Sequence, residues 1–488
     1  YMTKAVKYEK NYINNKLQNI VNDDLVSFHM PGHKKGKIYD KLGYENLVKN
    51  LYKMDTTEII ETDNLHSPEG IIKDSQERAK QIFKSEKTYY LVNGSTCGIQ
   101  AVILSTCVPG DKILINRDCH QSAINAFILG DVNPVYIKGS ICEDTYTING
   151  VNEKDVIDAI DNNSDVKVLM LTYPSYYGMV FDLEKICTYA HKKDMVVIVD
   201  EAHGAHLGLS EALPKSALQQ GADIVIQSVH KTLPSFTQSS IMHVQGNLVD
   251  KKNLERFLKI VQSSSPSYVM MSSLEIAIDI YDRFGQELMK DLLTNIDNFE
   301  KELSQIKGIK VLKGHDSTKL FVSLKDLGIN GYDLEEMLRY KYNIQVELSN
   351  YYGVLLICTI GNEKEDFDKF LDAIKSISKN LDIDNNLDKS DDNVTKLMKL
   401  NYPNLIPEKI ISPRQAFYSN KKEVLLKESI GQISGEYIIP YPPGISLTSP
   451  GEIITQEVVD YILECKKYGM HVSGLKDSSL EIIEIIDR

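Results

Sequence analysis

The sequence has no uninterrupted apolar run that approaches the roughly 20 residues needed to cross a bilayer. Residues 1–25 are polar and lack the apolar block that defines a secretion signal. From these absences we expect a cytoplasmic protein that makes no contact with a membrane.

Closely spaced cysteine pairs are also absent, and the 55 basic residues are outnumbered by 68 acidic ones. The seven cysteines are scattered without a Cys-x-x-Cys pair, which argues for reduced thiols and against a zinc or redox motif, so no metal site is expected. The formal net charge of −13 opposes binding to nucleic acid. The same charge mildly favours the approach of cationic small molecules.

What is present is an alternation of apolar runs and helical stretches. A chain of 488 residues is too long for one core and fits two to four domains. Between residues 85 and 245, short β-branched runs alternate with helical segments, which predicts a mostly parallel sheet buried on both faces. The expected strands are 89–92, 112–115, 134–137, 167–171, 195–199 and 224–226.

The rest of the chain divides around this α/β unit. A smaller α+β unit is expected to have strands at 309–312, 319–323 and 354–357 and helices near 333–341 and 364–378. The predicted divisions are an N-terminal arm 1–70, a large domain 71–300, a small α+β domain 301–380, an acidic linker 381–394 and a C-terminal α+β domain 395–488.

The run Leu91-Val-Asn-Gly-Ser-Thr-Cys-Gly98 follows a strand and opens a helix. Free backbone N–H groups, the helix dipole and the hydroxyls of Ser95 and Thr96 favour a phosphate there. An ordinary serine cap after a glycine turn explains the same pattern when it is taken alone.

Two further strand ends carry charged side chains. Asp200 ends the apolar strand 195–199, where a carboxylate can keep a heterocyclic nitrogen protonated. A capping or metal-binding aspartate is the alternative, although no Gly-x-x-x-x-Gly-Lys-Ser/Thr motif accompanies it. Lys231 follows the strand 224–226 and is either a Schiff-base lysine or an ordinary surface lysine.

His120 lies in the loop after the strand 112–115, where an imidazole can stack on an aromatic cofactor or simply cap a helix. Each feature is weak alone. A phosphate site, a stacking histidine, an aspartate and a lysine at the ends of strands in one sheet converge on pyridoxal 5'-phosphate (PLP).

At this point the chain resembles the fold-type I (aspartate-aminotransferase-like) PLP enzymes, and within them the bacterial ornithine/lysine/arginine decarboxylase family. The matching motifs are His29-Met-Pro-Gly-His-Lys34, Asp63-Asn-Leu-His-Ser-Pro-Glu-Gly70, Val199-Asp-Glu-Ala-His-Gly204, Ser228-Val-His-Lys231 and Tyr441-Pro-Pro-Gly-Ile445 with Pro450-Gly-Glu452. The resemblance covers nearly the whole chain and implies a mostly parallel seven-stranded sheet.

The resemblance also implies residue roles. Lys231 would form the Schiff base with PLP, Asp200 would pair with the pyridine nitrogen, and His120 would stack on the ring. His203 would lie near the ring, and a contact of Ser175 or Tyr176 to the ring hydroxyl is left open. The implied phosphate ligands are Gly94, Ser95, Thr96, Ser228 and His230, joined by Ser264 from a neighbouring subunit.

The resemblance also bears on substrate binding and on subunit assembly. Asp63, Glu69 and Glu452 are candidates for binding the distal cation of a basic amino acid, with solvated loop acids as the alternative. The long members of the family begin with a flavodoxin-like wing domain, and this sequence begins almost at the His29 motif. A homodimer or dimer of dimers with active sites at the interface is therefore expected.

The function implied is decarboxylation of a basic amino acid, with Lys231 or a neighbouring histidine returning a proton to Cα. L-Arginine to agmatine is the first choice, because the chain resembles the short biosynthetic arginine decarboxylases of Gram-positive bacteria. Lysine to cadaverine and ornithine to putrescine follow. An aminotransferase is disfavoured because residues 352–358 contain no arginine, and a non-catalytic PLP-fold protein because Lys231 and Asp200 are both retained.

Overall fold

The computed structural model describes residues 12–488 except 143–144, 146, 388–401, 404 and 442–443. Its centre is a seven-stranded sheet with the order β2-β10-β9-β8-β7-β3-β4, in which only β10 runs antiparallel to its neighbours. The strands are β2 (Lys87–Leu91), β3 (Lys112–Asn116), β4 (Asn133–Ile137), β7 (Val168–Thr172), β8 (Val196–Asp200), β9 (Ile224–Gln227) and β10 (Ser240–Val244). This is the mostly parallel α/β sheet that the sequence predicts.

Strand β10 is the strand of this sheet that the sequence reading missed. It contains two polar side chains, Ser240 and His243, so it does not read as a continuous apolar run. His243 is nevertheless fully buried, and its imidazole is satisfied by hydrogen bonds to Thr88 on β2 and Gln227 on β9. Polar side chains that find partners on neighbouring strands therefore hid this element.

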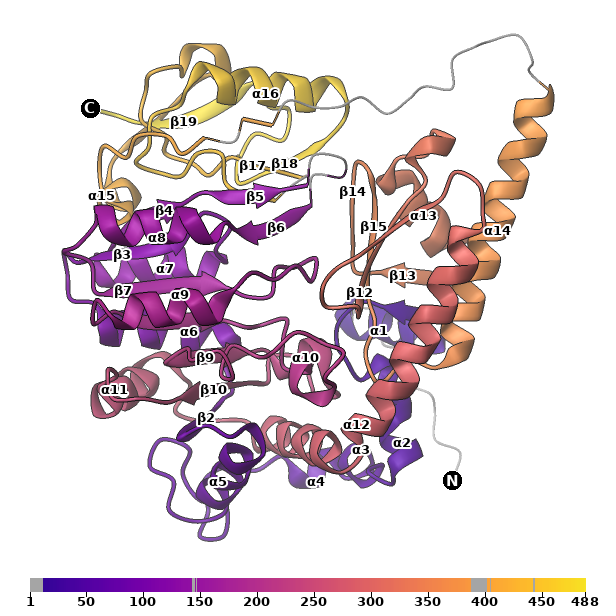
Figure 1. Cartoon of the computed structure of the whole chain (residues 1–488), viewed down its shortest axis with the longest axis horizontal. Coiled ribbons are helices and arrows are strands. Elements are labelled where there is room, and N and C mark those ends of the chain that lie inside the picture. Colours follow the sequence, from indigo (N-terminus) through magenta and orange to yellow (C-terminus); the bar gives the residue numbers. More distant parts are fainter. Residues whose placement is uncertain (1–11, 143–144, 146, 388–401, 404, 442–443) are drawn as a thin grey trace.

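Helices cover both faces of the sheet, as Figure 1 shows. One face packs against α6, α7 and α11 in its own apolar core, and the other packs against α8, α9 and part of α12. The helices are α5 (Ile71–Phe83), α6 (Gly94–Thr106), α7 (Gln121–Gly130), α8 (Glu153–Asn162), α9 (Leu183–His191), α10 (Val229–Thr232), α11 (Lys251–Val261) and α12 (Tyr268–Ser304). Burial on both faces leaves the strand ends as the place for polar chemistry.

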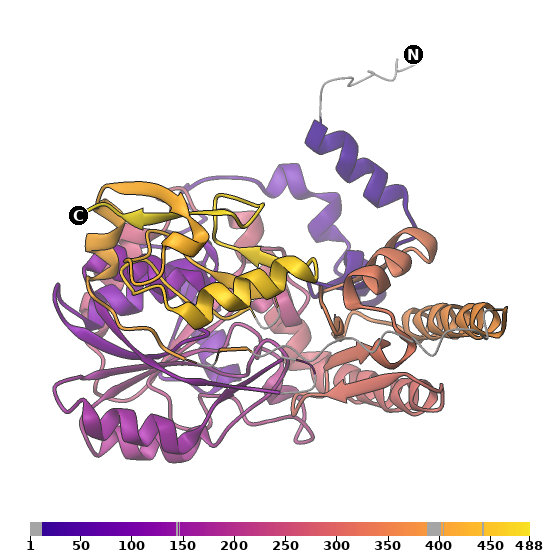
Figure 2. The same cartoon turned by 90° about the horizontal axis from the view of Figure 1, so that it is seen from above.

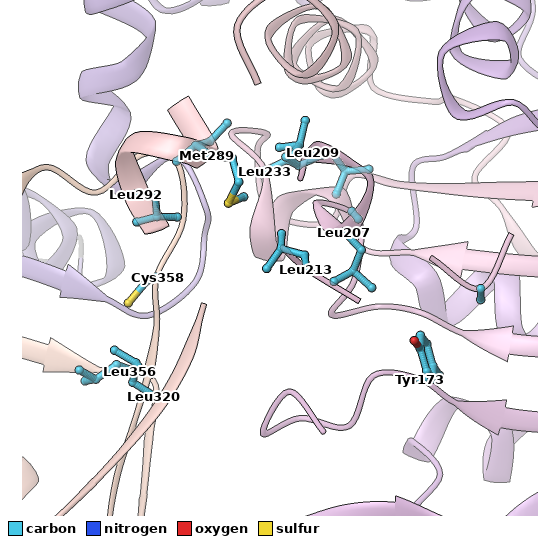
Figure 3. Packing of buried hydrophobic residues seen from close by; sticks show 14 of the residues in the cluster. Tyr173, Leu207, Leu209, Leu213, Leu233, Met289, Leu292, Leu320, Leu356 and Cys358 are labelled. Carbon is cyan, nitrogen blue, oxygen red and sulfur yellow. The ribbon is translucent and has the colours of Figure 1, made fainter. Parts of the chain in front are cut away.

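A second domain follows α12, with the four-stranded sheet β11-β12-β15-β14. Its elements are β11 (Lys310–Lys313), β12 (Lys319–Ser323), α13 (Gly331–Lys341), β13 (Ile344–Val346), β14 (Leu348–Asn350), β15 (Gly353–Ile357) and α14 (Lys364–Leu387). One apolar core continues from the large domain into this one. Figure 3 shows members of this core, with Leu207, Leu209, Leu213 and Leu233 from the large domain, Met289 and Leu292 from α12, and Leu320, Leu356 and Cys358 from the small domain.

The N-terminal arm packs on the second domain, because β1 (Val26–Phe28) pairs in parallel with β13. Its helices are α1 (Tyr12–Asn22), α2 (Lys37–Leu42), α3 (Asn46–Lys49) and α4 (Leu51–Met54). In the part of the chain that is described, no helix combines the length and the apolar character of a membrane span.

Two predicted domain limits differ from the structure. The boundary expected at residue 300 falls inside α12, which continues to Ser304. The acidic linker expected at 381–394 begins as helix, since α14 continues to Leu387, and residues 388–394 lie outside the described residues.

The C-terminal domain lies against the β4 edge of the large sheet, as Figures 1 and 2 show. Arg414 donates to the carbonyls of Ile128 and Leu129 on α7, and Lys409 donates to the carbonyl of Pro134 on β4. Its elements are α15 (Pro413–Tyr418), β16 (Lys421–Leu425), β17 (Ile439–Tyr441), α16 (Gln456–Lys467), β18 (His471–Ser473) and β19 (Ile482–Ile486). A hairpin of β5 (Gly139–Ile141) and β6 (Ile148–Val151) lies next to it.

A buried ion pair joins this domain to the large one. Arg117, just after β3, is 5% exposed and Glu452 is 1% exposed. The guanidinium reaches the two carboxylate oxygens at 2.6 and 2.7 Å and also donates to the carbonyls of Ser446 and Leu447. The backbone N–H of Ser449 donates to the same carboxylate, so both charged groups are well satisfied.

We predict that Glu452→Gln lowers the free energy of unfolding by about 3–5 kcal/mol, because it leaves the Arg117 cation buried without a counter-charge. Denaturant unfolding followed by circular dichroism measures the change. The control is Asp165→Asn in the exposed pair of Lys112 and Asp165, which are 2.8 Å apart and 49% and 63% exposed. That change should cost less than about 1 kcal/mol. Equal losses in the two variants would contradict the role given to burial.

Candidate active site

A cavity of about 640 Å³ opens at the carboxyl ends of the parallel strands. Its wall includes Met30 from the N-terminal arm, Leu348 from the small domain, and Ile439 and Tyr441 from the C-terminal domain. The sequence-predicted residues that line it are Gly94, Ser95, Thr96, His120, Asp200, His203, Ser228, His230 and Lys231. Tertiary structure therefore gathers into one cavity residues that span more than a hundred positions of sequence.

Hydroxyl groups and a helix N-terminus meet at one end of this cavity. Ser95 lies in the first turn of α6, and its Oγ is 2.7 Å from Oγ of Ser228, which follows β9. Gly94 adopts a positive φ of 71°, which a side chain would strain. Free N–H groups of the helix and two hydroxyls make this end of the cavity suited to an anion.

His230 lies near these hydroxyls. Its Nδ1 donates to the carbonyl of Ser239 at 2.9 Å, so its Nε2 carries a proton only when the ring is charged. Burial lowers the pKa of His230 in the cavity without a bound anion. An anion beside it would reverse that effect by stabilising the imidazolium.

Lys231 and His203 form a hydrogen-bonded pair in the cavity. The amine Nζ of Lys231 is 2.9 Å from Nε2 of His203. Burial, opposed by the negative charge of Asp200, lowers the pKa of Lys231, and burial together with the Lys231 charge lowers the pKa of His203 well below its usual value. A larger share of Lys231 is therefore a neutral, nucleophilic amine at neutral pH than of a surface lysine.

Asp200 ends β8 and is 4% exposed. Its Oδ1 accepts a hydrogen bond from the backbone N–H of Ala202 at 3.1 Å. Among the described residues no side chain pairs with its other oxygen. A buried carboxylate with a free oxygen is arranged to accept from a protonated group in the cavity.

His120 is the N-cap of α7. Its Nδ1 accepts from the backbone N–H of Ser122 at 3.2 Å and faces the Ser122 hydroxyl at 2.8 Å. His120 therefore caps a helix, which is one of the two roles that the sequence allowed. This position is compatible with the other role, stacking on an aromatic cofactor. Capping fixes the ring at the cavity wall, which is what a stacking group requires.

Four candidate residues do not line the cavity. Asp63 uses its carboxylate to accept backbone N–H groups around the start of α5, among them those of Glu69 and Gly70. Glu69 and Ser264 are exposed. Asp63, Glu69 and Ser264 remain predictions about a neighbouring subunit. Glu452 is bound to Arg117 through both oxygens, which argues against its predicted contact with substrate.

Sequence reasoning missed or left open a second group of residues in and around the cavity. Tyr176 packs its ring 4.4 Å from that of His203 and donates its hydroxyl to Glu347. Glu347 also accepts the backbone N–H of Met30 at 2.9 Å. Ser175 instead donates to the carbonyl of Ile148 and is buried. Only folding brings Met30, Tyr176 and Glu347 together, so no local motif could have revealed their contacts.

The part of the chain that the structure describes contains no cluster of three or more potential metal ligands among histidine, cysteine, aspartate and glutamate. Of the predicted Tyr441–Ile445 motif, Pro442 and Pro443 lie outside the described residues.

Comparisons with known proteins agree on one family. Residues 13–322 match the family profile described as Orn/Lys/Arg decarboxylase, major domain, and residues 395–479 match Orn/Lys/Arg decarboxylase, C-terminal domain. The arginine decarboxylase of Bacillus subtilis (strain 168) is 36% identical over 471 residues, 94% of each chain. The inducible lysine decarboxylase of Escherichia coli (strain K12) is 23% identical, over 93% of this chain and 77% of its own.

Among solved structures, the lysine decarboxylase of Francisella novicida superposes with a TM-score of 0.78 at 22% identity, covering 99% of this chain and 84% of that one. At this identity the likeness shows the shared fold. It supports the assignment of the mostly parallel sheet and its two smaller domains to one known architecture.

We predict that Asp200→Asn lowers the pKa of Lys231 further, because the negative charge of Asp200 stabilises the ammonium form. Competitive acetylation of cofactor-free protein over a pH series, read by peptide mapping, should show the Lys231 midpoint moving to lower pH. Glu184→Gln, a change in the exposed pair with Lys215, should leave the midpoint in place. An unmoved or raised midpoint in Asp200→Asn would refute the coupling.

Proposed function

The chain belongs to the Orn/Lys/Arg decarboxylase family, and we propose that it removes the α-carboxylate of L-arginine as CO₂ and releases agmatine, with PLP as cofactor. The observation that carries the choice of substrate is the similarity to relatives named arginine decarboxylase, at 34–36% identity over 94% of this chain. The relatives named lysine decarboxylase are 23% identical.

The residues around the cavity fit PLP. The paired hydroxyls of Ser95 and Ser228, with Gly94, Thr96 and His230, supply donors for a phosphate. The free oxygen of Asp200 supplies an acceptor for a protonated ring nitrogen. Lys231 supplies the amine, and Nδ1 of His203 is buried without a hydrogen-bond partner among the described residues.

In this proposal PLP, when bound, supplies a protonated ring that accepts the electron pair freed as the bond between Cα and the carboxylate breaks. The chain supplies the setting for that chemistry. Asp200 would keep the ring nitrogen protonated, and His120 would stack on the ring. Tyr176 and the C-terminal residue Tyr441 form part of the cavity wall.

Proton return to Cα is assigned to the pair of Lys231 and His203. Nζ of Lys231 lies 2.9 Å from Nε2 of His203, so a Lys231 amine that is not bound to the cofactor would have a hydrogen-bonding partner within the cavity. The lowered pKa of His203 keeps its imidazole neutral at rest, so Lys231 is the group that carries the proton.

Lysine and ornithine remain the alternative substrates, and an aminotransferase the alternative reaction. An aminotransferase of this fold needs an arginine free to hold the substrate carboxylate. Arg117 lines the described cavity, but its guanidinium is already paired with the carboxylate of Glu452. Strand β15 contains no arginine either, and these features argue against the transaminase.

We further propose a homodimer or dimer of dimers in the cytoplasm, with the active sites at the interface. The seven free cysteines support a reducing compartment. Helix α1 buries none of its residues and exposes Tyr12, Ile13, Leu17 and Val21, a face that a second subunit would cover.

If Ser264 of the neighbouring subunit contacts the phosphate, Ser264→Ala should weaken PLP binding about tenfold, the cost of one lost hydrogen bond to a charged group. Titration of cofactor-free protein with PLP, followed by absorbance, measures this. Ser304→Ala, on the far end of α12, is the control. Sedimentation showing a monomer that binds PLP with full affinity would contradict the shared site.

The proposed reaction predicts that purified PLP-loaded protein releases CO₂ and an equal amount of agmatine from L-arginine. Lys231→Ala should lower the rate roughly a hundredfold to ten-thousandfold, whereas Lys215→Ala, an exposed lysine, should leave it unchanged. Arginine, lysine and ornithine are compared in parallel. A preference for lysine would change only the substrate assigned to the enzyme. Absence of CO₂ release from all three amino acids would contradict decarboxylation.

A further inference from the structure

A basic amino acid needs a negative group at the far end of its pocket. In the described structure two carboxylates line the cavity, Asp200 and Asp118. Asp200 is already assigned to the ring nitrogen. Asp118 stands on the loop after β3, two positions before His120, and has no part in the functions assigned above.

Asp118 is a carboxylate without a cationic partner. Its Oδ1 accepts from the side-chain amide of Asn116 at 2.8 Å, and no lysine, arginine or histidine of the described residues pairs with it. Burial raises the pKa of the Asp118 carboxyl, and the Asn116 amide only partly offsets this. A cationic group on a bound ligand would form the ion pair that the Asp118 carboxylate lacks.

The position of Asp118 is fixed before any ligand arrives. Nδ2 of Asn116 also reaches the hydroxyl of Thr172 at 3.2 Å, and Oδ1 of Asn116 accepts the backbone N–H of Thr172 at 3.0 Å. Asn116 therefore ties the Asp118 loop to the end of β7. A preorganised carboxylate binds a cation at little cost in side-chain entropy.

The cavity that Asp118 lines suits a flat, delocalised cation. Tyr176, Tyr177 and Tyr441 line the same cavity, and aromatic faces attract such cations. Arg117 next to Asp118 does not compete, because its guanidinium is held by Glu452.

Other acids near the cavity are already engaged. Glu347 accepts from Met30 and from Tyr176 and does not line the cavity. Glu452 is neutralised by Arg117 through both oxygens. Asp63 accepts several backbone N–H groups.

We propose that Asp118 is the specificity-determining residue that binds the distal guanidinium of the substrate, held in place by Asn116. This inference rests on the proposed function, since it presumes a substrate with a distal cation.

The test compares agmatine with N-carbamoylputrescine, which has the same length but a neutral ureido group in place of the guanidinium. Calorimetry measures the binding of each compound to PLP-loaded wild type, Asp118→Asn, Asp118→Glu and Glu347→Gln. Steady-state kinetics with L-arginine gives KM and kcat for the same proteins, and the absorbance of bound PLP shows whether the cofactor site is intact.

In Asp118→Asn we expect agmatine binding to weaken roughly tenfold to hundredfold, the loss of a hydrogen bond between charged groups. Binding of the neutral analogue should stay within about twofold, because the amide preserves the shape of the carboxylate without its charge. KM for L-arginine should rise more than kcat falls. Asp118→Glu should keep more of the preference for agmatine, and Glu347→Gln should keep the wild-type ratio.

An unchanged ratio of the two affinities in Asp118→Asn would overturn the inference, as would a loss of preference confined to Glu347→Gln. Failure of the proposed function looks different, since wild type itself would then neither release CO₂ from a basic amino acid nor bind agmatine. Active wild type with an unaffected Asp118→Asn ratio would reject the role of Asp118 alone.

Discussion

The register of the parallel strands is the constraint on which the site depends. Thr172 at the end of β7 lies opposite Asp200 at the end of β8, and Asp200 lies opposite Ile226 of β9. Because these strands run in the same direction and are buried on both faces, their carboxyl ends form one edge where polar side chains can reach a ligand. A slip of one residue would turn Asp200 into a helix-covered face and remove it from the cavity.

Burial then sets the chemistry of that edge. The same low-polarity surroundings that lower the pKa of Lys231 and His203 raise the pKa of Asp118. The neutral forms of Lys231 and His203 are therefore easier to populate here than at a protein surface, and a bound cation would stabilise the charged form of Asp118. Electrostatic interactions inside such a site are stronger than in water, so a few side chains suffice to select and orient a ligand.

The cavity is completed by parts of the chain that lie outside the large sheet. Met30 from the N-terminal arm and Glu347 from the small domain meet over Tyr176, while Arg117 binds the C-terminal domain through Glu452. Ile439 and Tyr441 of the C-terminal domain form part of the wall, so the ion pair of Arg117 and Glu452 joins to the large domain a domain that contributes to the cavity. The contact between these two domains therefore bears on the cavity as well as on stability.

The sequence by itself determined the sheet, its approximate strands and the residues at their ends. Apolar runs broken by helices are a local signal, and Lys231, Asp200, Ser95 and His120 directly follow or cap such runs. The family assignment, which the comparisons confirm, follows from the same motifs. The missed strand β10 has buried polar residues whose partners lie on other strands.

Only the tertiary structure decided how the remaining acids are used. From the sequence, Asp63 and Glu452 were among the candidates for binding a cation, and nothing drew attention to Glu347 or Asp118 as acids of the site. In the folded chain, Glu452 forms an ion pair with Arg117, and Asp63 accepts hydrogen bonds from backbone N–H groups. Glu347 accepts a hydrogen bond from Tyr176, whereas Asp118 lines the cavity. The availability of a charged group depends on which distant donors reach it, and no local pattern in the chain records those distances.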